Sequence, residues 1–532
     1  MSLTKQVHLY SVATDAFYTD EEQYLHAQML KLYKLRKKAD ECKWRKAMIN
    51  RVIAKKKEKM IELLNLHLEK KETRKINDDA LKDKAIVSLF ESSLTRALNL
   101  KTNSLTDKIL IVNVFFFQVF EDIVKYGFEH HGDKYVFLTA SAGQIRTKRA
   151  VFIREKDYIA IRPKLMCGLS IEDINKQGGI NPNKFLAYLA LNNSATDVWE
   201  DFDIDKAIVV EDFETEVEGK NDHIDDVTYE IKREWNKTLI PHTDGCGMML
   251  HGKTRMLRAP FIKGLIVQFP FDKFIREKCV NGKAIVKDIY GTKHDILEEG
   301  IEYILFKSQF KLWKYFKNWN EYKQKFKENH CEVSYCNIEE DYIPKGRINY
   351  QMLQTLSDMS NEEIKRLTKA TTKEINSIGN DFSTTMRLLG ATPYNQNPSW
   401  FQQALMIYPE LFRDNYCRDI LRQTKKSLVK QAKAGRLRIN GYYTFVVPDF
   451  YAVCEYLFLG IDNPNGLLKE KEVYTTLFRD EDELACLRSP HLYREWPIMI
   501  NKRNEELDKW FGETKCIYTS CKSLTSKMLQ FD

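Results

Sequence analysis

Two stretches of the chain place charged side chains beside residues that form tight turns. In residues 243–266 (TDGCGMMLHGKTRMLRAPFIKGLI) an Asp-Gly-Cys-Gly turn permits positive backbone dihedral angles, and Arg258 and Lys263 follow near the mouth of an apolar strand. In the final stretch a strand-like ACLRSPHL, which contains Arg488, precedes a strand-like CIYTS, and the sequence stops at Asp532. Cations can offset charge on phosphoryl oxygens, and a carboxylate can bind Mg²⁺. Taken alone, Lys263 is better explained as a solvated strand end and Arg488 as part of a surface ion pair.

The order of these pieces resembles the two-barrel RNA polymerases, the superfamily of the cellular transcription enzymes and of the RNA-dependent RNA polymerases of RNA silencing. In that superfamily an Arg-x-Pro strand and Leu-His precede an Asp-x-Asp-Gly-Asp loop, which residues 488–492 (RSPHL) and 531–532 (FD) resemble. Its first barrel has Asp-Gly-x-Gly before a strand with an Arg and a Lys-Gly pair, as in residues 243–266. Residues 141–155 and 183–210 look most like the bacteriophage and prophage members, single-chain enzymes that are thought to copy DNA.

This resemblance implies that the protein synthesises RNA from nucleoside triphosphates on a nucleic-acid template. In such enzymes three aspartates hold Mg²⁺ ions that activate the RNA 3′-hydroxyl and stabilise the leaving pyrophosphate. Asp532 would be the first of these catalytic metal ligands, so we expect the chain to be a fragment that is inactive alone. Lys263, as a catalytic cation, and Arg258 would reach the triphosphate or the RNA 3′-end. Arg488 would bind the incoming ribose and help to select it over deoxyribose.

The elements that position these residues are predicted to form an α+β fold with four regions. Residues 1–132 are predicted to be a helical, basic amino-terminal region, and residues 133–300 a strand-rich region with the first double-psi β-barrel. Residues 301–434 are predicted to be a helical connector, and residues 435–532 the second, catalytic barrel, which is incomplete. The helices and strands follow from hydrophobic periodicity, whereas the two barrels follow from the resemblance alone.

Local patterns give three more specific expectations. Leucine, methionine and valine recur at helical spacing from residue 21 to about residue 100, without proline or glycine. Residues 107–126 are apolar on most sides and predict a buried helix. Residues 436–447 (RLRINGYYTFVV) predict a β-hairpin, because Asn440-Gly441 suits a tight turn between two strands.

Three charged segments each allow a binding role and a structural one. Residues 31–75 hold 17 Lys and Arg against six Asp and Glu, which suits a phosphate backbone but also a solvated helix face. The acidic residues 211–226 could hold a cation or form a solvent loop. Residues 306–328 interleave lysines with aromatic rings, so they could stack on bases or form an amphipathic helix that packs on its neighbours.

Composition limits the class of protein. A chain of 532 residues with 43% hydrophobic residues is long enough for two to four globular domains. Its most apolar run, residues 109–120, is too short to cross a bilayer and no signal peptide is visible, so we expect a cytoplasmic protein, in a bacterial host, without a membrane partner. The 11 cysteines fit reduced thiols, although Cys331/Cys336 and Cys516/Cys521 could also contribute to a zinc site.

Three other functions compete with DNA-templated RNA synthesis. The enzyme could take RNA as its template. The protein could instead bind nucleic acid without polymerase chemistry, as a catalytically dead homologue would. A metal-dependent nuclease would also use carboxylates and Mg²⁺, but it would need further acids close to Asp532.

Overall fold

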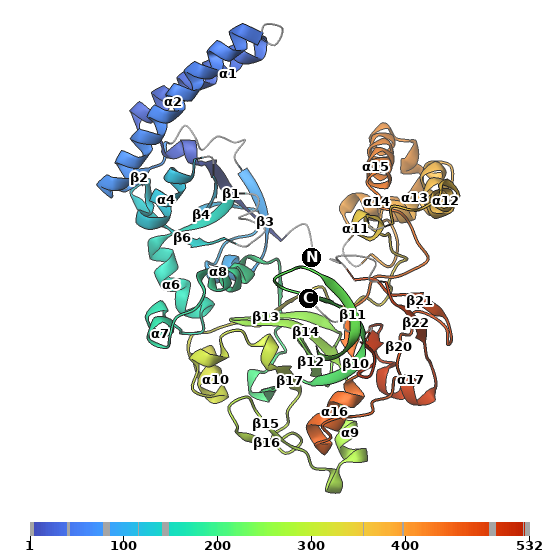
Figure 1. Cartoon of the computed structure of the whole chain (residues 1–532). Helices are drawn as coiled ribbons and strands as arrows, with labels where there is room; N and C mark the ends of the chain where they lie inside the picture. Colours follow the sequence, from blue (N-terminus) through green and yellow to red (C-terminus); the bar gives the residue numbers. More distant parts are fainter. Residues whose placement is uncertain are drawn as a thin grey trace.

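The structure, a computed structural model, describes residues 5–39, 43–77, 86–114, 116–140, 148–354, 356–395, 398–488, 496–524 and 526. The predicted mixture of helices and strands is confirmed (Figure 1). An amino-terminal sheet lies beside two central sheets, and a group of helices lies above the second central sheet in this view. None of the helices within the described ranges is long and apolar enough to cross a lipid bilayer.

The amino-terminal region is built on a seven-stranded sheet as well as on helices. Its strands, in the order β2-β5-β6-β7-β4-β1-β3, are β1 (Gln6–Ala13), β2 (Arg74–Lys75), β3 (Ile86–Phe90), β4 (Leu105–Asn113), β5 (Phe128–His130), β6 (Asp133–Thr139) and β7 (Arg149–Arg154). The helix predicted over residues 107–126 is wrong in its first half, which is β4, and only α4 (Phe117–Tyr126) is helical. β4 pairs with β1 and β7 and is buried at residues 109–112, so its continuous apolar run belongs to a central strand. Because β6 and β7 join this sheet, it extends past the predicted boundary at residue 132.

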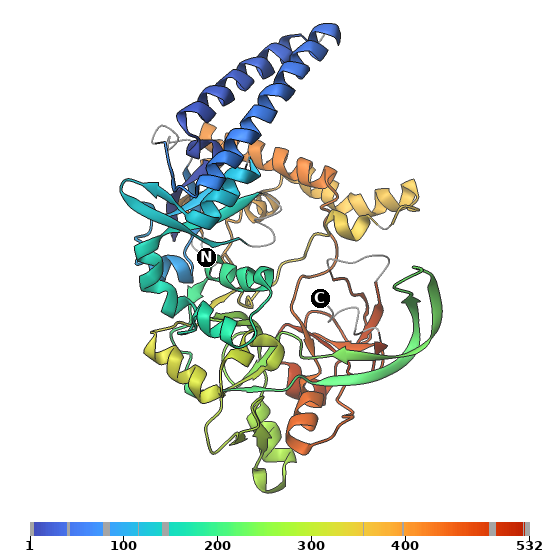
Figure 2. The same cartoon turned by 60° about the vertical axis from the view of Figure 1, so that its left-hand side comes forward.

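The long amino-terminal helices form one hairpin, α1 (Asp20–Lys38) and α2 (Lys43–Lys70), which projects from the sheet (Figures 1 and 2). α1 begins with a capping box, in which the N–H of Glu22 donates to the Thr19 hydroxyl and the N–H of Thr19 donates to the Glu22 carboxylate. The helical run predicted to continue to residue 100 is wrong after α2. Two strands, β2 and β3, and one short helix, α3 (Ser93–Ala97), follow instead.

The two central sheets repeat one strand order. Their strands are β8 (Asp197–Val198), β9 (Ala207–Val210), β12 (Cys246–Met249), β13 (Arg255–Ala259), β14 (Ile262–Gln268), β17 (Tyr303–Phe306) and β18 (Ser334–Cys336) in the first sheet, and β19 (Val446–Pro448), β20 (Glu472–Tyr474), β21 (Glu483–Ala485), β22 (Ile498–Asn501) and β23 (Ile517–Thr519) in the second. The first sheet contains the order β9-β17-β12-β14-β13 and the second the order β19-β23-β20-β22-β21. In both, successive neighbours pair parallel, antiparallel, parallel and antiparallel. The two sheets are therefore copies of one structural repeat.

The two repeats share one apolar core. Helix α9 (Phe271–Lys278) follows β14 and helix α17 (Glu505–Phe511) follows the equivalent strand β22. Side chains of both sheets, of α9 and α17, and of α16 (Phe450–Leu459) form a continuous buried cluster. Within it the ring of Phe269 lies 6.2 Å, between centroids, from that of Trp510. This packing fixes one sheet against the other, as in the core of a single domain.

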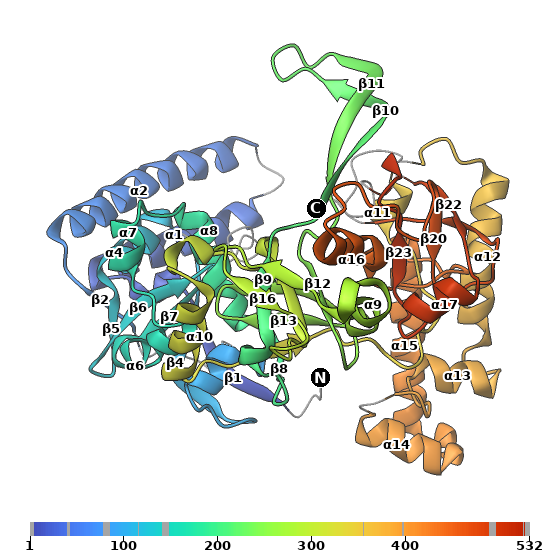
Figure 3. The same ribbon diagram turned by 90° about the horizontal axis from the view of Figure 1, so that it is seen from below.

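A long antiparallel arm, β10 (Glu214–Ile224) and β11 (Ile231–Pro241), projects from the first repeat between β9 and β12 (Figures 2 and 3). The acidic residues 211–226, expected to be a solvent loop or a cation site, contain the whole of β10. The loop prediction is wrong because these acids alternate along a paired strand. The opposite strand supplies cations to them, as in the ion pair between Glu216 and Lys237 at 3.6 Å.

The helical connector leads from the first repeat to the second. The remaining elements are α6 (Glu155–Leu165), α7 (Ile171–Lys176), α8 (Pro182–Ala190), α10 (Trp319–Glu328), α11 (Tyr350–Leu353), α12 (Asn361–Ser377), α13 (Phe382–Leu388), α14 (Trp400–Ile407), α15 (Asn415–Lys433), β15 (Ile285–Lys287), β16 (Lys293–Asp295) and short 3-10 helices at Thr14–Phe17, Leu191–Asn193, Ile204–Lys206, Val280–Gly282, Lys307–Gln309, Trp313–Tyr315 and Pro409–Arg413.

The hairpin predicted over residues 436–447 is wrong. Its backbone pairs with residues 346–348, where the N–H groups of Gly346 and Ile348 donate to the carbonyls of Gly441 and Leu437. Residues 346–348, which are distant in the sequence, thus form the backbone hydrogen bonds that the predicted hairpin would have formed within residues 436–447.

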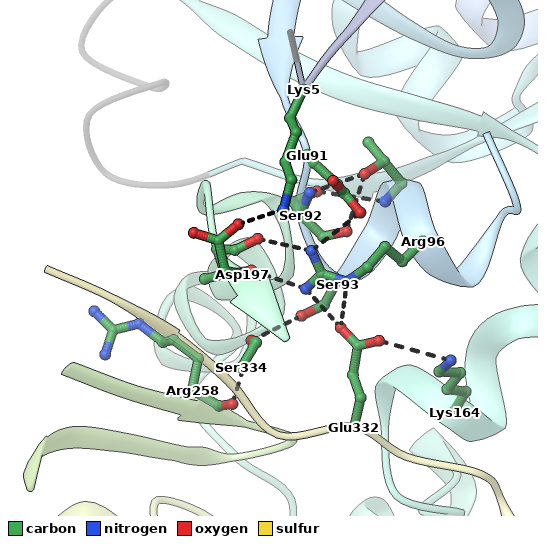
Figure 4. Close-up of polar contacts among 12 residues, drawn as sticks. Lys5, Glu91, Ser92, Ser93, Arg96, Lys164, Asp197, Arg258, Glu332 and Ser334 are labelled. Carbon is green, nitrogen blue, oxygen red and sulfur yellow. Dashed lines mark hydrogen bonds and ion pairs between the residues drawn. The ribbon is translucent and has the colours of Figure 1, made fainter. Parts of the chain in front are cut away.

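A polar cluster joins the amino-terminal region to the edge of the first repeat (Figure 4). The guanidinium of Arg96 on α3 donates to the Glu332 carboxylate at 2.7 Å and to the Thr196 carbonyl at 2.7 Å. Glu332 lies just before β18, the strand that pairs with β13. Lys5 adds an ion pair with Asp197 on β8 at 2.8 Å. These contacts hold the β8-β18 edge against the amino-terminal sheet.

A second buried polar group lies in the second repeat, where Asp449 follows β19. Its carboxylate is fully buried and accepts hydrogen bonds from the N–H groups of Ala452, Leu467 and Leu468. It thereby caps α16 and holds the 467–468 segment against that helix. Burial raises the pKa of Asp449 to about 6, although the three hydrogen bonds oppose this shift.

Replacing Arg96 tests the contact between the amino-terminal region and the first repeat. Arg96→Ala leaves the Glu332 carboxylate, only 16% exposed, without its guanidinium partner. We expect the free energy of unfolding to fall by about 2–4 kcal/mol, measured by urea denaturation. Lys125→Ala, which breaks the exposed ion pair with Glu121, is the matched control and should leave the urea midpoint unchanged. Equal midpoints for the two variants would contradict the role given to Arg96.

The raised pKa of Asp449 makes its contribution to stability depend on pH. A carboxyl whose folded pKa exceeds its unfolded value stabilises most below the unfolded pKa, and that contribution is lost as pH rises through about 6. The difference in free energy of unfolding between the natural protein and Asp449→Asn should therefore fall by about 2 kcal/mol from about pH 4.5 to about pH 7.5. Asp133→Asn, at a carboxyl whose pKa Lys156 and Arg154 lower, should show no such fall. A constant difference for Asp449→Asn would rule out the titration.

Candidate active site

Arg258 and Lys263 lie directly opposite each other on the antiparallel strands β13 and β14. Residues opposite each other in such a pair project from the same face of the sheet, with their Cβ atoms about 5 Å apart. Two like charges at this separation repel each other, and an anion between them would remove the repulsion. The structure therefore brings these two predicted site residues together in an arrangement suited to a phosphate group.

Hydrogen bonds from the aromatic segment, residues 306–328, hold the turn that joins β13 and β14. Phe261 adopts φ = 62°, a left-handed conformation that costs a residue with a side chain roughly 1 kcal/mol or more. The buried hydroxyl of Tyr322 on α10 donates to the Pro260 carbonyl at 2.8 Å, and the N–H of Lys311 donates to the Phe261 carbonyl at 2.8 Å. The rings of residues 306–328 are mostly buried in the core of the first repeat, which favours the packing role predicted for this segment over base stacking.

The side-chain amide of Gln309 is buried against Gly264, the residue that follows Lys263. The side chain of Gln309 is fully buried, donates to the Leu265 carbonyl at 2.9 Å and accepts from the N–H of Phe306 at 3.0 Å. The Gln309 side chain has room here because Gly264 lacks a side chain. A Cβ at residue 264 would lie 2.5 Å from the Gln309 amide nitrogen, which is closer than atoms can approach. The Lys-Gly pair thus places a cation next to a position where only glycine leaves room. The Lys263-Gly264 pattern indicated this site, but no local signal pointed to Gln309 or Tyr322.

Arg258 lies at the junction with the amino-terminal region. Its guanidinium donates to the Leu257 carbonyl at 2.8 Å, and its Nε is buried without a hydrogen-bond partner among the described residues. It lines a small cavity of about 20 Å³ together with Ser93, Lys164 and Glu332. The Ser334 hydroxyl, which lies 3.3 Å from that of Ser93, also donates to the Arg258 carbonyl (Figure 4). The Arg96 cluster therefore positions the strand that carries Arg258.

Arg488 lies in the second repeat, on the wall of a larger cavity. This cavity, of about 590 Å³, opens between the connector and the second sheet. Its lining is mainly apolar and aromatic, with contributions from Ile348 and Met352 of the connector and Tyr442 and Phe478 of the second repeat. A cavity of this volume is large enough for a nucleoside-sized ligand.

The two repeats carry their predicted cations on equivalent hairpins. Arg258 and Lys263 flank the turn between β13 and β14, and Arg488 follows β21, the equivalent of β13. The structure nevertheless places Arg258 and Arg488 on the walls of two different cavities. Asp532 and the residues 489–492 of the predicted Arg-x-Pro motif lie outside the described residues.

Side chains that could hold a metal ion are spread through the described part of the chain. No group of three or more His, Cys, Asp and Glu side chains gathers there with metal-site geometry. The four cysteines considered for zinc are free thiols, and burial raises the pKa of Cys521 to about 12. A thiol with such a pKa stays protonated at neutral pH when no metal ion is bound. Asp532, the metal ligand that the family resemblance implies, is not among the described residues.

Comparisons with known proteins show which family this sequence matches. A family model described as RNA dependent RNA polymerase matches residues 50–495. The chain is 46% identical over 538 residues to the DNA-directed RNA polymerase YonO of Bacillus phage SPbeta, a match that covers 100% of this chain. It spans only 63% of the length of that relative.

A solved structure, RNA dependent RNA polymerase QDE-1 from Thielavia terrestris, matches with a TM-score of 0.47 and 13% sequence identity. This match covers 86% of the present chain and 51% of the other. The family model covers most of the sequence, including the cation-bearing hairpin of the first repeat and Arg488. The chain therefore belongs to the RNA-dependent RNA polymerase family.

Proposed function

We propose that this chain is part of an RNA polymerase that joins nucleoside triphosphates into RNA on a nucleic-acid template. The observation that carries the proposal is the pair of repeated sheets on one core, in a chain that belongs to a polymerase family. The 46% identical relative is named a DNA-directed RNA polymerase, which favours DNA as the template and the cytoplasm of a bacterial host as the place of action. The family name favours RNA as the second candidate template.

The two repeated sheets are proposed to be the two double-psi β-barrels of the superfamily. Their identical strand order and pairing support this assignment, because two barrels derived from one fold would repeat both. The shared core would keep the cation-bearing barrel and the acid-bearing barrel at one separation. Phosphoryl transfer depends on positioning and on neutralising charge, so such a fixed separation suits this chemistry.

Each predicted site residue then has a distinct role. Lys263 offsets the charge that grows on the phosphoryl oxygens, and Arg258 binds the triphosphate or the RNA 3′-end. Arg488 binds the ribose of the incoming nucleotide. The Asp532 carboxylate is a hard oxygen ligand of the kind that Mg²⁺ prefers. Bound Mg²⁺ would lower the pKa of the attacking 3′-hydroxyl and stabilise the negative charge on the leaving oxygen.

Lys263→Ala in the full-length protein tests the proposed catalytic cation. We expect nucleotide incorporation to fall by at least about 100-fold, because one preorganised charge on the transition state is lost, while template binding changes by less than about twofold. Incorporation is measured with Mg²⁺ on DNA and RNA templates of one sequence. Lys253→Ala removes an exposed lysine that pairs with Asp341, and this control should incorporate normally.

The same assay decides between the candidate functions. Greater incorporation on DNA supports the DNA template, and greater incorporation on RNA supports the second candidate. Template binding without incorporation by the natural full-length protein would instead show a nucleic-acid-binding protein, and loss of the template would show a nuclease. Normal incorporation by Lys263→Ala would remove Lys263 from the mechanism.

Arg488→Ala tests the proposed contact with ribose. A hydrogen bond to the 2′-hydroxyl contributes about 1.4 kcal/mol or more to discrimination, so its loss should raise dNTP use relative to NTP use about tenfold. The measurement is the ratio of kcat/KM for dNTP and NTP in the full-length protein. Arg479→Ala, at an exposed residue of the second repeat, is the control. An unchanged ratio for Arg488→Ala would contradict the ribose contact.

A further inference from the structure

The α1-α2 hairpin has a buried base and an exposed outer part. At the base Met60 and Leu64 are fully buried in the amino-terminal core, and buried Arg74 donates to the carboxylates of Glu22 at 2.8 Å and Asp122 at 2.6 Å. We call residues 31–59 the distal hairpin. Ile53 is the one buried residue in its described part. The hairpin is therefore firmly attached at one end, while its other end extends away from the body (Figures 1 and 2).

The distal hairpin carries the positive charge of the whole chain. It contains 13 Lys and Arg against three Asp and Glu, a net charge of +10, whereas the rest of the chain holds 70 Lys and Arg against 72 Asp and Glu. Within this segment the acids therefore offset only three of the 13 cations. Ten positive charges are thus concentrated on 29 residues that have few neighbours.

These cations are spaced along the helices in rows. Arg51, Lys55 and Lys59 on α2 are all exposed and lie four residues apart, so they share one side of the helix and span about 12 Å. Duplex DNA carries one phosphate charge per about 1.7 Å of its axis when both strands are counted, so a duplex of that length holds about seven phosphates. Trp44, which is 73% exposed, adds a ring that can stack on an unpaired base.

We propose that the distal hairpin is a second nucleic-acid-binding surface that holds the phosphate backbone of the template or product outside the site of synthesis. The concentration of net positive charge carries this inference, because a merely solvated helix gains nothing from ten like charges that repel one another. The binding is electrostatic and independent of base sequence. The identity of the strand rests on the proposed function, but the binding of phosphate backbone does not.

A second copy of the chain is the main competing partner. The β10-β11 arm is acidic, with eight Asp and Glu against four Lys and Arg over residues 214–241, and it exposes Trp235 and Tyr229. Its net charge of −4 is much smaller in magnitude than the +10 of the distal hairpin, and two of its acids, Asp222 and Glu216, already pair across the arm. The arm would therefore leave most of the cations unpaired, whereas a nucleic acid would not.

The test compares two triple variants of the 532-residue chain. Arg51→Gln with Lys55→Gln and Lys59→Gln removes one row from the distal hairpin. Lys426→Gln with Lys430→Gln and Lys433→Gln removes three exposed lysines at similar spacing from α15, with the same change in net charge. Glutamine has nearly the helix propensity of lysine and arginine, and circular dichroism checks that both variants keep their helices.

Binding to a 30-base-pair duplex and to a single strand of the same length is measured without nucleotides at several salt concentrations. The distal-hairpin variant should bind at least about tenfold more weakly at about 100 mM salt, and the slope of log Kd against log salt should fall by two to three. The α15 variant should change Kd by less than about twofold. Lys263→Ala should bind normally, so loss of binding here is separable from failure of the proposed catalysis.

Three results would overturn the inference. The first is an unchanged Kd and salt slope in the distal-hairpin variant. The second is an equal loss in both triple variants, which would mean that net charge alone sets the affinity. The third is normal nucleic-acid binding with a changed oligomeric state in size-exclusion chromatography, which would assign the surface to contacts between copies.

Discussion

One apolar core holds the two repeated sheets together, and the candidate active site depends on it. The core takes side chains from both sheets and from the helices α9, α16 and α17. In close-packed interiors side chains have few alternative positions, so two sheets that interdigitate in this way keep a fixed relative position. The backbone positions of polar residues at the edges of the two sheets are therefore also fixed relative to one another, even where their side chains make no contact. This constraint keeps Lys263 and Arg488, which come from segments far apart in the sequence, on sheets with a fixed separation, as the proposed shared site requires.

Buried polar groups then fix details that apolar packing leaves open. Gln309 crosses beside Gly264, Tyr322 supports the turn after Arg258, and Asp449 holds a loop onto α16. Each is fully buried and hydrogen-bonded, as buried polar groups must be to avoid a large desolvation cost. Together they place the cation-bearing hairpin and the second repeat more precisely than the non-directional hydrophobic effect can.

The sequence predicted those parts of the fold whose signal is local. Arg258 and Lys263 were expected near the mouth of an apolar strand because the Asp-Gly-Cys-Gly turn and the Lys-Gly pair lie close together, and the structure places them on the adjacent strands β13 and β14. The strand β4 was predicted as a helix, because a continuous apolar run looks the same in a buried helix and in a central strand. Residues 436–447 pair with residues 346–348, and Arg96 binds Glu332, across distances in sequence that no local pattern contains. Long-range pairing, not weak propensity, limited the prediction of both the fold and the site.

The repeated strand order also bears on how such a chain could have arisen. A single ancestral unit of five strands would expose the apolar face that the two halves now bury against each other. It could cover that face by associating with an identical copy as a symmetric homodimer. Joining two copies in one gene removes the requirement that both halves stay the same. Each half could then change its polar residues independently while the former subunit interface persisted as the core of one polypeptide.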